Sequence, residues 1–407
     1  MRRVVITGMG LWSSIGQDLQ TVTESLRLGR SGIIYDQSRV DYGYQSGLVG
    51  NVPKPDLKPF LPRERRNLMS NDAEYAYMAT QQAFDQAKLS EEFLQDNEVG
   101  IIWGGLTNSH QQEYSRIMEE THCSSLLGYT AMFQYDASSA VINLSSIFNL
   151  RGVNMTIDAA CASSAHAVGV ASLYIKNGLQ DTILVGGSSE IVKESIGYIL
   201  VDALLSDTRY NQKPGLASRP FDKDAVGAIL SGGAAALVLE EYEHAKARGA
   251  NILAEIVGYG FASGVKGLPW LPDVNAEIKS LERALINANI QPKDVDFLHS
   301  YAVSDTIGDA IEAKAIQQVF GGYYTQISST DSITGHEGGM AGASGIVYSV
   351  LMMQNGFIAP NINCDNPIEE AKELNIIRST TQCNLNTILS SSSGLAGIQC
   401  AIVLRKI

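Results

Sequence analysis

The sequence has 407 residues, enough for two domains or for one large duplicated one. Hydrophobic residues make up 45% of it and charged residues 18%, a balance that excludes a disordered or coiled-coil protein. The formal net charge of −13 argues against nucleic acid or an acidic membrane surface as a general partner. No apolar run approaches the roughly 18 residues that a membrane helix needs.

The cysteines and the first residues predict a cytoplasmic protein. The 5 cysteines are odd in number and include no C-x-x-C pair, which fits a reducing compartment without a disulfide framework. Met1-Arg2-Arg3 precedes an apolar run, as in a signal sequence, but Gly8 and Gly10 interrupt that run early, so a first strand is the better interpretation. No metal-ligand spacing and no complete phosphate-binding loop is found, so we expect neither a metal nor a cofactor.

Buried strands alternate with helices through the first part of the chain. The predicted elements are a strand at Val4–Thr7, a turn at Gly8–Gly16, helices at Thr21–Arg27 and Asp72–Ala87, a strand at Val99–Trp103, a helical insertion at about 107–150, a strand at Val153–Ile157, a helix reaching about Lys176, strands at Thr182–Val185 and Ala234–Glu240, and a charged helix at Glu241–Arg248.

The second part repeats this pattern. Its predicted elements are strands at Ile252–Tyr259 and Val295–His299, helices at Ala276–Asn287, Asp309–Phe320 and Gly342–Met353, and paired strands at Thr387–Leu389 and Ala401–Leu404. Such alternation predicts an α/β protein with buried, largely parallel sheets covered by helices. We expect an internal duplication, with an N-terminal half at 1–250 and a C-terminal half at 251–407.

The stretch from Asp158 to His166 is the strongest candidate for chemistry. It places Cys161 where a strand turns into a helix, so the thiol would lie among unpaired N–H groups whose partial positive charge favours the thiolate. The alternative is that Cys161 is a small buried hydrophobic residue, as a free cysteine usually is. Cys161 alone does not decide between them.

Three stretches resemble the β-ketoacyl-acyl carrier protein synthases, most of all the bacterial synthase I class. They are Ala160–His166, Ser329–His336 and Gly356–Asn363, and the resemblance runs nearly from end to end. It implies a dimer with a thiolase-like duplicated fold, whose two βαβαβ-type halves form α/β/α/β/α layers. It also implies a Cys that accepts an acyl chain from acyl carrier protein, and two His that assist malonyl decarboxylation. This chemistry needs a thiolate nucleophile and hydrogen-bond donors that stabilise the negative charge of the enolate.

The resemblance breaks within the site itself. It carries over Cys161 and His336 as catalytic residues, but the other family His falls on Tyr301, a neutral side chain that stays protonated to about pH 10 and is a poor proton shuttle. The family's Lys falls on Asp331, and a carboxylate beside the thiol disfavours the thiolate. Glu312, the expected partner of that Lys, would now face a like charge.

The acyl gate and the docking edge also depart from the family. The gate phenylalanine falls on Ser393 and the facing loop becomes 225–228, so the gate positions Ser393 and Ala228 lack bulky side chains. Regulated admission of acyl chains is therefore not expected. Basic residues survive near one expected docking edge for carrier protein, at Arg63, Arg65 and Arg66.

His299 is a possible replacement for the missing imidazole. It precedes Tyr301 by two residues, so on an extended strand both point to the same face. The offset of two strand rises, roughly 6 to 7 Å, exceeds what catalytic geometry tolerates. We therefore expect a structural histidine.

Three functions remain open. The concerted losses favour a chain-length-factor-like subunit, as in type II polyketide and aryl polyene systems, which would pair with an active ketosynthase and shape its acyl tunnel. Acyl carrier protein would then dock mainly on the partner. The second function is an active β-ketoacyl synthase that uses Cys161 as the acyl-accepting nucleophile. The third, a malonyl-carrier decarboxylase, is disfavoured because the imidazole pair is broken.

Overall fold

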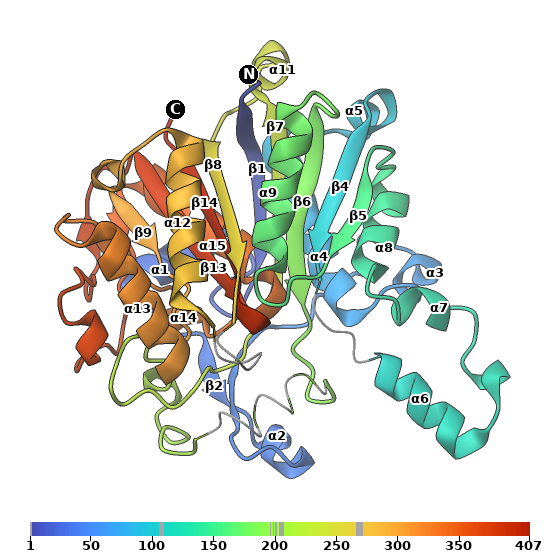
Figure 1. The fold of residues 1–407 in the computed structure, drawn as a ribbon. Coiled ribbons are helices and arrows are strands. Elements are labelled where there is room, and N and C mark those ends of the chain that lie inside the picture. The colour runs from blue at the N-terminus through green and yellow to red at the C-terminus, as the bar shows by residue number, and fades with distance from the viewer. Residues whose placement is uncertain are drawn as a thin grey trace.

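A computed structural model describes residues 2–105, 110–195, 197, 199, 202, 207–265 and 272–407. Strands and helices alternate along these segments, as the sequence predicts, and pack into one layered body (Figure 1). None of the helices in these segments is long and apolar enough to cross a membrane.

A ten-stranded sheet runs through the molecule in the order β10-β9-β13-β14-β8-β1-β7-β6-β4-β5. In Figure 1 the strands of the first half spread to the right of β1 and those of the second half to its left. The first five strands along the chain are β1 (Val4–Trp12), β4 (Val99–Gly104), β5 (Asn154–Ile157), β6 (Thr182–Ser189) and β7 (Gly233–Glu241). The others are β8 (Ala254–Ser263), β9 (Phe297–His299), β10 (Gln326–Ser328), β13 (Thr387–Gly394) and β14 (Ile398–Arg405).

The order of these strands confirms the duplicated fold. From β1 outward the first half reads β1-β7-β6-β4-β5, and from β8 outward the second half reads β8-β14-β13-β9-β10. In each half the first two pairings are antiparallel and the last two are parallel, so the prediction of largely parallel sheets is wrong. The halves join where β1 pairs antiparallel with β8. The exact division at residue 250 stays a prediction.

The helices cover both faces of this sheet. Within the described segments the helices, including α6 away from the sheet, are α1 (Leu19–Leu28), α2 (Gln37–Tyr42), α3 (Arg63–Arg66), α4 (Asn71–Ala87), α5 (Glu91–Asp96), α6 (His110–Thr121), α7 (Ala131–Gln134), α8 (Ser139–Phe148), α9 (Ser163–Lys176), α11 (Tyr242–Ala247), α12 (Val274–Ala288), α13 (Thr306–Phe320), α14 (Asp331–Thr334) and α15 (Ala341–Asn355). Two-stranded pairs β2 (Ile33–Tyr35) with β3 (Leu48–Gly50) and β11 (Phe357–Ile358) with β12 (Thr381–Gln382) lie outside the main sheet.

Side chains that alternate along the strands divide the interior into layers. The central core lies around α9 and α15, which pack against each other, whereas α4 and α8 cover the outer face of the first half and α12 that of the second. On β7, the residues Ala235, Leu237 and Leu239 face the central core, and Ala234, Ala236 and Val238 face the core under α4. The five layers are therefore the outer helices α4 and α8, the strands of the first half, the central helices α9 and α15, the strands of the second half, and the outer helix α12. This is the expected α/β/α/β/α layering.

The turn predicted at Gly8–Gly16 is wrong in its first half, because β1 continues to Trp12. Gly8 and Gly10 lie inside this strand against α4, where a Cβ on Gly10 would stand 1.9 Å from the carbonyl oxygen of Ala79. The glycines therefore permit a close approach of helix to strand and do not end the strand.

The helical insertion predicted at about 107–150 contains α6, α7 and α8, and residues 106–109 of it lie outside the described part of the chain. Figure 1 shows α6 standing away from the body at the lower right. None of the residues of α6 is buried. Large apolar side chains are exposed just after it, at Leu126, Tyr129 and Met132.

Candidate active site

Cys161 lies on a tight turn between β5 and α9, as its sequence context predicts. Ala160 holds the left-handed backbone conformation with φ of 51°, and Ser163 Oγ accepts a hydrogen bond from the Ala159 N–H at 2.8 Å. The next residue, Ala162, is fully buried, whereas Cys161 is partly exposed. The turn thus directs the thiol away from the central core.

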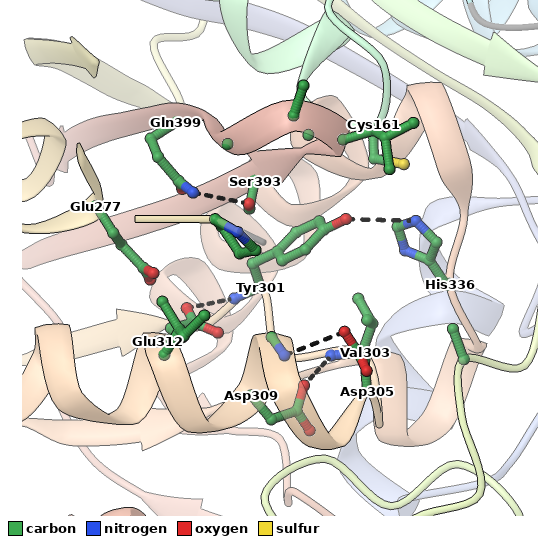
Figure 2. Close-up of a pocket in the computed structure, with 18 of the residues that line it drawn as sticks. Cys161, Glu277, Tyr301, Val303, Asp305, Asp309, Glu312, His336, Ser393 and Gln399 are labelled. Atoms are coloured by element: carbon green, nitrogen blue, oxygen red, sulfur yellow. Dashed lines mark hydrogen bonds between the residues drawn. The ribbon is translucent and has the colours of Figure 1, made fainter. Parts of the chain in front are cut away.

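The thiol lines a cavity of about 210 Å³ at the carboxyl ends of the strands. Figure 2 shows Cys161, Tyr301 and His336 grouped around it. Tyr301 comes shortly after β9, and His336 follows β10. These are parallel strands whose carboxyl ends meet at one edge of the sheet, which explains how residues so distant in sequence converge.

His336 and Tyr301 both interact with the Cys161 thiol. Burial raises the pKa of this thiol, but the charge and hydrogen bond of His336 and the hydroxyl of Tyr301 outweigh burial, so the pKa of Cys161 is lowered. Burial lowers the pKa of His336, whereas Cys161 and Asp331 raise it to about 10. The pair thus favours thiolate and imidazolium. The sequence predicts this effect from the N–H groups at the start of α9, and two side chains from the other half of the chain contribute to it as well.

Asp331 lies behind His336, with its Oδ2 atom 3.2 Å from Nδ1 of the imidazole. The carboxylate itself acts to raise the pKa of Cys161, as the sequence analysis expects, but its effect is smaller than that of His336. Asp331 thus disfavours the thiolate directly, as expected, but it also stabilises the imidazolium that favours the thiolate.

Tyr301 lies between the Cys161 thiol and the Glu312 carboxylate. Its hydroxyl lies 3.5 Å from Nε2 of His336, and its ring meets the imidazole edge to face. Burial, together with Cys161, raises the pKa of Tyr301 well above its usual value. The phenol therefore stays neutral and keeps its proton.

Glu312 does not pair with Asp331. Its Oε1 atom accepts hydrogen bonds from the Tyr301 N–H at 2.9 Å and from the Ser391 hydroxyl at 2.7 Å. Burial raises the pKa of Glu312. Two further carboxyl groups lie near Glu312, because Glu312 and Asp309 both raise the pKa of Glu277 of α12, after burial as the main cause.

The sequence analysis missed Glu277, which is buried and lines the same cavity. The available signal was helical spacing, since Glu277 precedes Leu281 and Leu285 on the apolar stripe of α12. Asp309, also missed, accepts hydrogen bonds from the N–H groups of Val303 and Phe221.

The two gate positions line the cavity together with Cys161. Ser393 lies near the end of β13, where its hydroxyl accepts a hydrogen bond from Gln399 Nε2 of β14 at 2.9 Å. Ala228 lies across the cavity on the loop that precedes β7. Both side chains are small, so neither blocks the space beside the thiol.

His299 is a structural histidine. Its Nε2 atom lies 2.8 Å from the Thr330 hydroxyl and its Nδ1 atom 3.4 Å from the Ser390 hydroxyl. Burial lowers the pKa of His299 to about 4, so the ring is neutral. It does not line the cavity. Among the described residues, no group of three or more His, Cys, Asp or Glu could hold a metal ion.

The duplicated fold and the cysteine cavity place the chain in the thiolase-like fold class, and sequence comparison identifies its family. Residues 1–245 match the family profile "Beta-ketoacyl synthase, N-terminal domain" and residues 253–365 match "Beta-ketoacyl synthase, C-terminal domain". The chain therefore belongs to the β-ketoacyl synthase family.

The chain is similar to two kinds of relatives over full length. It is 38% identical to 3-oxoacyl-[acyl-carrier-protein] synthase 1 of Escherichia coli strain K12, with 100% of both chains covered. A crystal structure of a β-ketoacyl synthase from Burkholderia phymatum has a TM-score of 0.94 at 29% identity, covering 100% of both chains. A chain of "the ishigamide ketosynthase/chain length factor" has a TM-score of 0.91 at 26% identity, covering 100% of this chain and 99% of that one.

Proposed function

We propose that this chain is a chain-length-factor-like subunit that pairs with an active ketosynthase and shapes the acyl tunnel, with weak or no condensation activity of its own. The observation that carries the proposal is the neutral phenol of Tyr301 beside His336 and the thiol, at the position where the resemblance implies an imidazole. Condensation of a malonyl thioester develops enolate charge, which a charged or readily protonated donor stabilises. A phenol with a raised pKa donates one hydrogen bond and exchanges its proton poorly.

The edge of the sheet supports an assembly with a second chain. In the described part of the chain β5 pairs only with β4, and Asn154 of β5 is exposed. An exposed edge strand is a ready surface for pairing with another chain. Because β5 leads directly into the Cys161 turn, a partner on this edge would lie close to the cavity.

The cavity and the surface agree with a tunnel-shaping role. Small side chains at Ser393 and Ala228 leave the space beside the thiol open without a bulky gate. Acyl carrier protein would dock mainly on the partner, with the exposed Arg63 and Arg65 of α3 as a secondary contact. Among the structural relatives is a type II polyketide acyl-carrier protein in complex with its ketosynthase, with a TM-score of 0.87 at 28% identity. The products would be polyketide, aryl polyene or fatty-acid-like chains.

The second candidate function is an active β-ketoacyl-acyl carrier protein synthase. The lowered pKa of Cys161 favours it, because a thiolate is the species that accepts an acyl chain. So does the identity of 38% to a synthase 1 over the whole chain.

Co-expression with each ketosynthase encoded near this chain separates the two functions. Native mass spectrometry measures the assembly, and acyl loading followed by peptide mapping shows which cysteine carries the acyl group. A one-to-one heterodimer with elongation dependent on the partner's cysteine supports the proposal. A homodimer that elongates malonyl units alone contradicts it and supports the synthase.

A further inference from the structure

His336 connects a nucleophile on one side to a carboxylate on the other. Its Nδ1 atom lies 3.2 Å from Asp331 Oδ2, and its Nε2 atom faces the Tyr301 hydroxyl at 3.5 Å and the Cys161 thiol (Figure 2). With Nδ1–H donated to Asp331, Nε2 is left to exchange a proton with the thiol. A nucleophile, a base and a group that orients the base form the general arrangement of acyl-transfer triads.

The same arrangement suits hydrolysis better than condensation. Asp331 is buried within the site, so its negative charge repels the carboxylate of an incoming malonyl group. Water carries no charge and meets no such repulsion. A base held by a carboxylate can take a proton from water, whereas the neutral Tyr301 phenol cannot.

We propose that Cys161, His336 and Asp331 form a triad that hydrolyses short-chain acyl thioesters. The Cys161 thiolate attacks the thioester carbonyl, the new carbon–sulfur bond forms, and the bond to the leaving thiol breaks as His336 gives that thiol its proton. His336 then takes a proton from water, whose oxygen attacks the acyl-cysteine carbonyl, and the bond to Cys161 breaks. The products are a free carboxylic acid and a free thiol.

Each residue has a distinct part in this reaction. Cys161 and His336 are catalytic because they touch the reacting atoms, and Asp331 is a positioning residue that acts through His336. The Tyr301 hydroxyl remains a hydrogen-bond donor beside the thiol, where it can stabilise charge on the carbonyl oxygen. The cavity of about 210 Å³ beside the thiol has room for a short acyl group.

This activity goes beyond the proposed partner role and is tested separately from it. The full chain, purified by itself, is mixed with butyryl-N-acetylcysteamine in water enriched in oxygen-18. We expect repeated turnover to butyrate carrying one heavy oxygen, and loss of turnover in Cys161→Ala. A wild-type chain that stays acylated at Cys161 or releases no butyrate overturns the hydrolysis, whatever assembly native mass spectrometry finds.

The pH profile tests the positioning role of Asp331. We expect Asp331→Asn to lower the hydrolysis rate by about tenfold to a hundredfold, and to move the limb that reports His336 in the acyl-enzyme to lower pH, since the carboxylate that stabilises the imidazolium is gone. Asp331→Glu should restore part of the rate. The matched control is Asp72→Asn, because Asp72 is a buried carboxylate on α4 that accepts a hydrogen bond from Ser188 and does not line the cavity. The pH profile of this variant should match that of the wild type. An unchanged profile in Asp331→Asn overturns the triad.

Discussion

The hydroxyl of Tyr301 lies 3.5 Å from Nε2 of His336, and the two rings meet edge to face with their centroids 5.5 Å apart. Tyr301, which the resemblance to the family aligns with an imidazole, is therefore in contact with the imidazole of His336. The Tyr301 side chain is therefore close enough to Cys161 and His336 to affect their chemistry.

Restoring both family side chains should raise condensation activity. In the double variant Tyr301→His with Asp331→Lys, a second imidazole lies beside the thiol and the buried negative charge is removed, so we expect at least about a tenfold gain. The measurement is elongation of an acyl-carrier thioester with malonyl-carrier protein, followed by mass spectrometry.

The control for this double variant is Tyr301→Phe, which keeps the ring and removes the hydroxyl. It should give no gain. Absence of any gain in the double variant would mean that the backbone around the cavity, and not the two side chains, limits condensation.

The pH dependence of Cys161 alkylation should report its pairing with His336. His336→Gln removes the charge that lowers the pKa of Cys161, so burial prevails and the alkylation curve should move to higher pH. At pH 7 we expect the rate with iodoacetamide to fall by about tenfold, the change that one pKa unit gives. Peptide mass spectrometry measures each cysteine separately.

Two controls accompany the alkylation experiment. Cys364 is buried and its pKa is raised to about 11, so it should react slowly in every variant. His299→Gln removes a buried histidine that does not line the cavity, and it should leave the Cys161 curve in place. A curve that moves equally in both histidine variants would refute the specific pairing.

Glu277→Gln should make stability less sensitive to rising pH. Burial and the neighbouring carboxylates raise the pKa of Glu277 well above its usual value, so the folded chain binds this proton more tightly than the unfolded chain. The resulting stabilisation is complete below the unfolded pKa and is lost as pH rises toward the folded pKa. We therefore compare the free energy of unfolding of the variant with that of the wild type by urea titration. The difference, variant minus wild type, should be larger at pH 8 than at pH 5.

Glu240→Gln provides the opposite case. Burial raises the pKa of Glu240, but Arg248 and His244 together lower it by a larger amount, so the net shift of the pKa is downward. This carboxylate stabilises the fold at neutral pH, and its removal should lower the free energy of unfolding there. If Glu277→Gln behaved in the same way, Glu277 would be a paired carboxylate and our account of the cavity would fail.

Gly10→Ala should destabilise the sheet. A Cβ at this position would meet the carbonyl oxygen of Ala79 at 1.9 Å, so α4 must move away from β1. We expect a loss of about 1 to 3 kcal/mol, the usual cost of overpacking, measured as the free energy of unfolding in urea. Gly215→Ala is the matched control, because its Cβ would find the nearest atom, Cβ of Ser31, at 3.6 Å. Equal losses in both variants would argue against the close packing of α4 on β1.

The sequence by itself determined the succession of strands and helices, since hydrophobic periodicity is a local property. It also located Cys161 at a strand-to-helix turn. The replacement of family side chains by Tyr301, Asp331 and Ser393 stays a prediction from the resemblance. These conclusions needed only neighbours along the chain. The length of β1 was predicted wrongly, because glycines are typical of turns. Gly8 and Gly10 instead allow close packing against α4, a helix that is distant in sequence.

Only the tertiary structure decided which side chains meet. Asp331 contacts His336, and Glu312 accepts a hydrogen bond from the Tyr301 N–H. Glu277 enters the cavity from α12. The carboxyl ends of strands from both halves converge at one edge of the sheet, and pKa shifts depend on the distances set there and on burial from water. Neither quantity is a property of sequence spacing, so the balance between Asp331, which disfavours the thiolate, and His336, which favours it, followed from the fold alone.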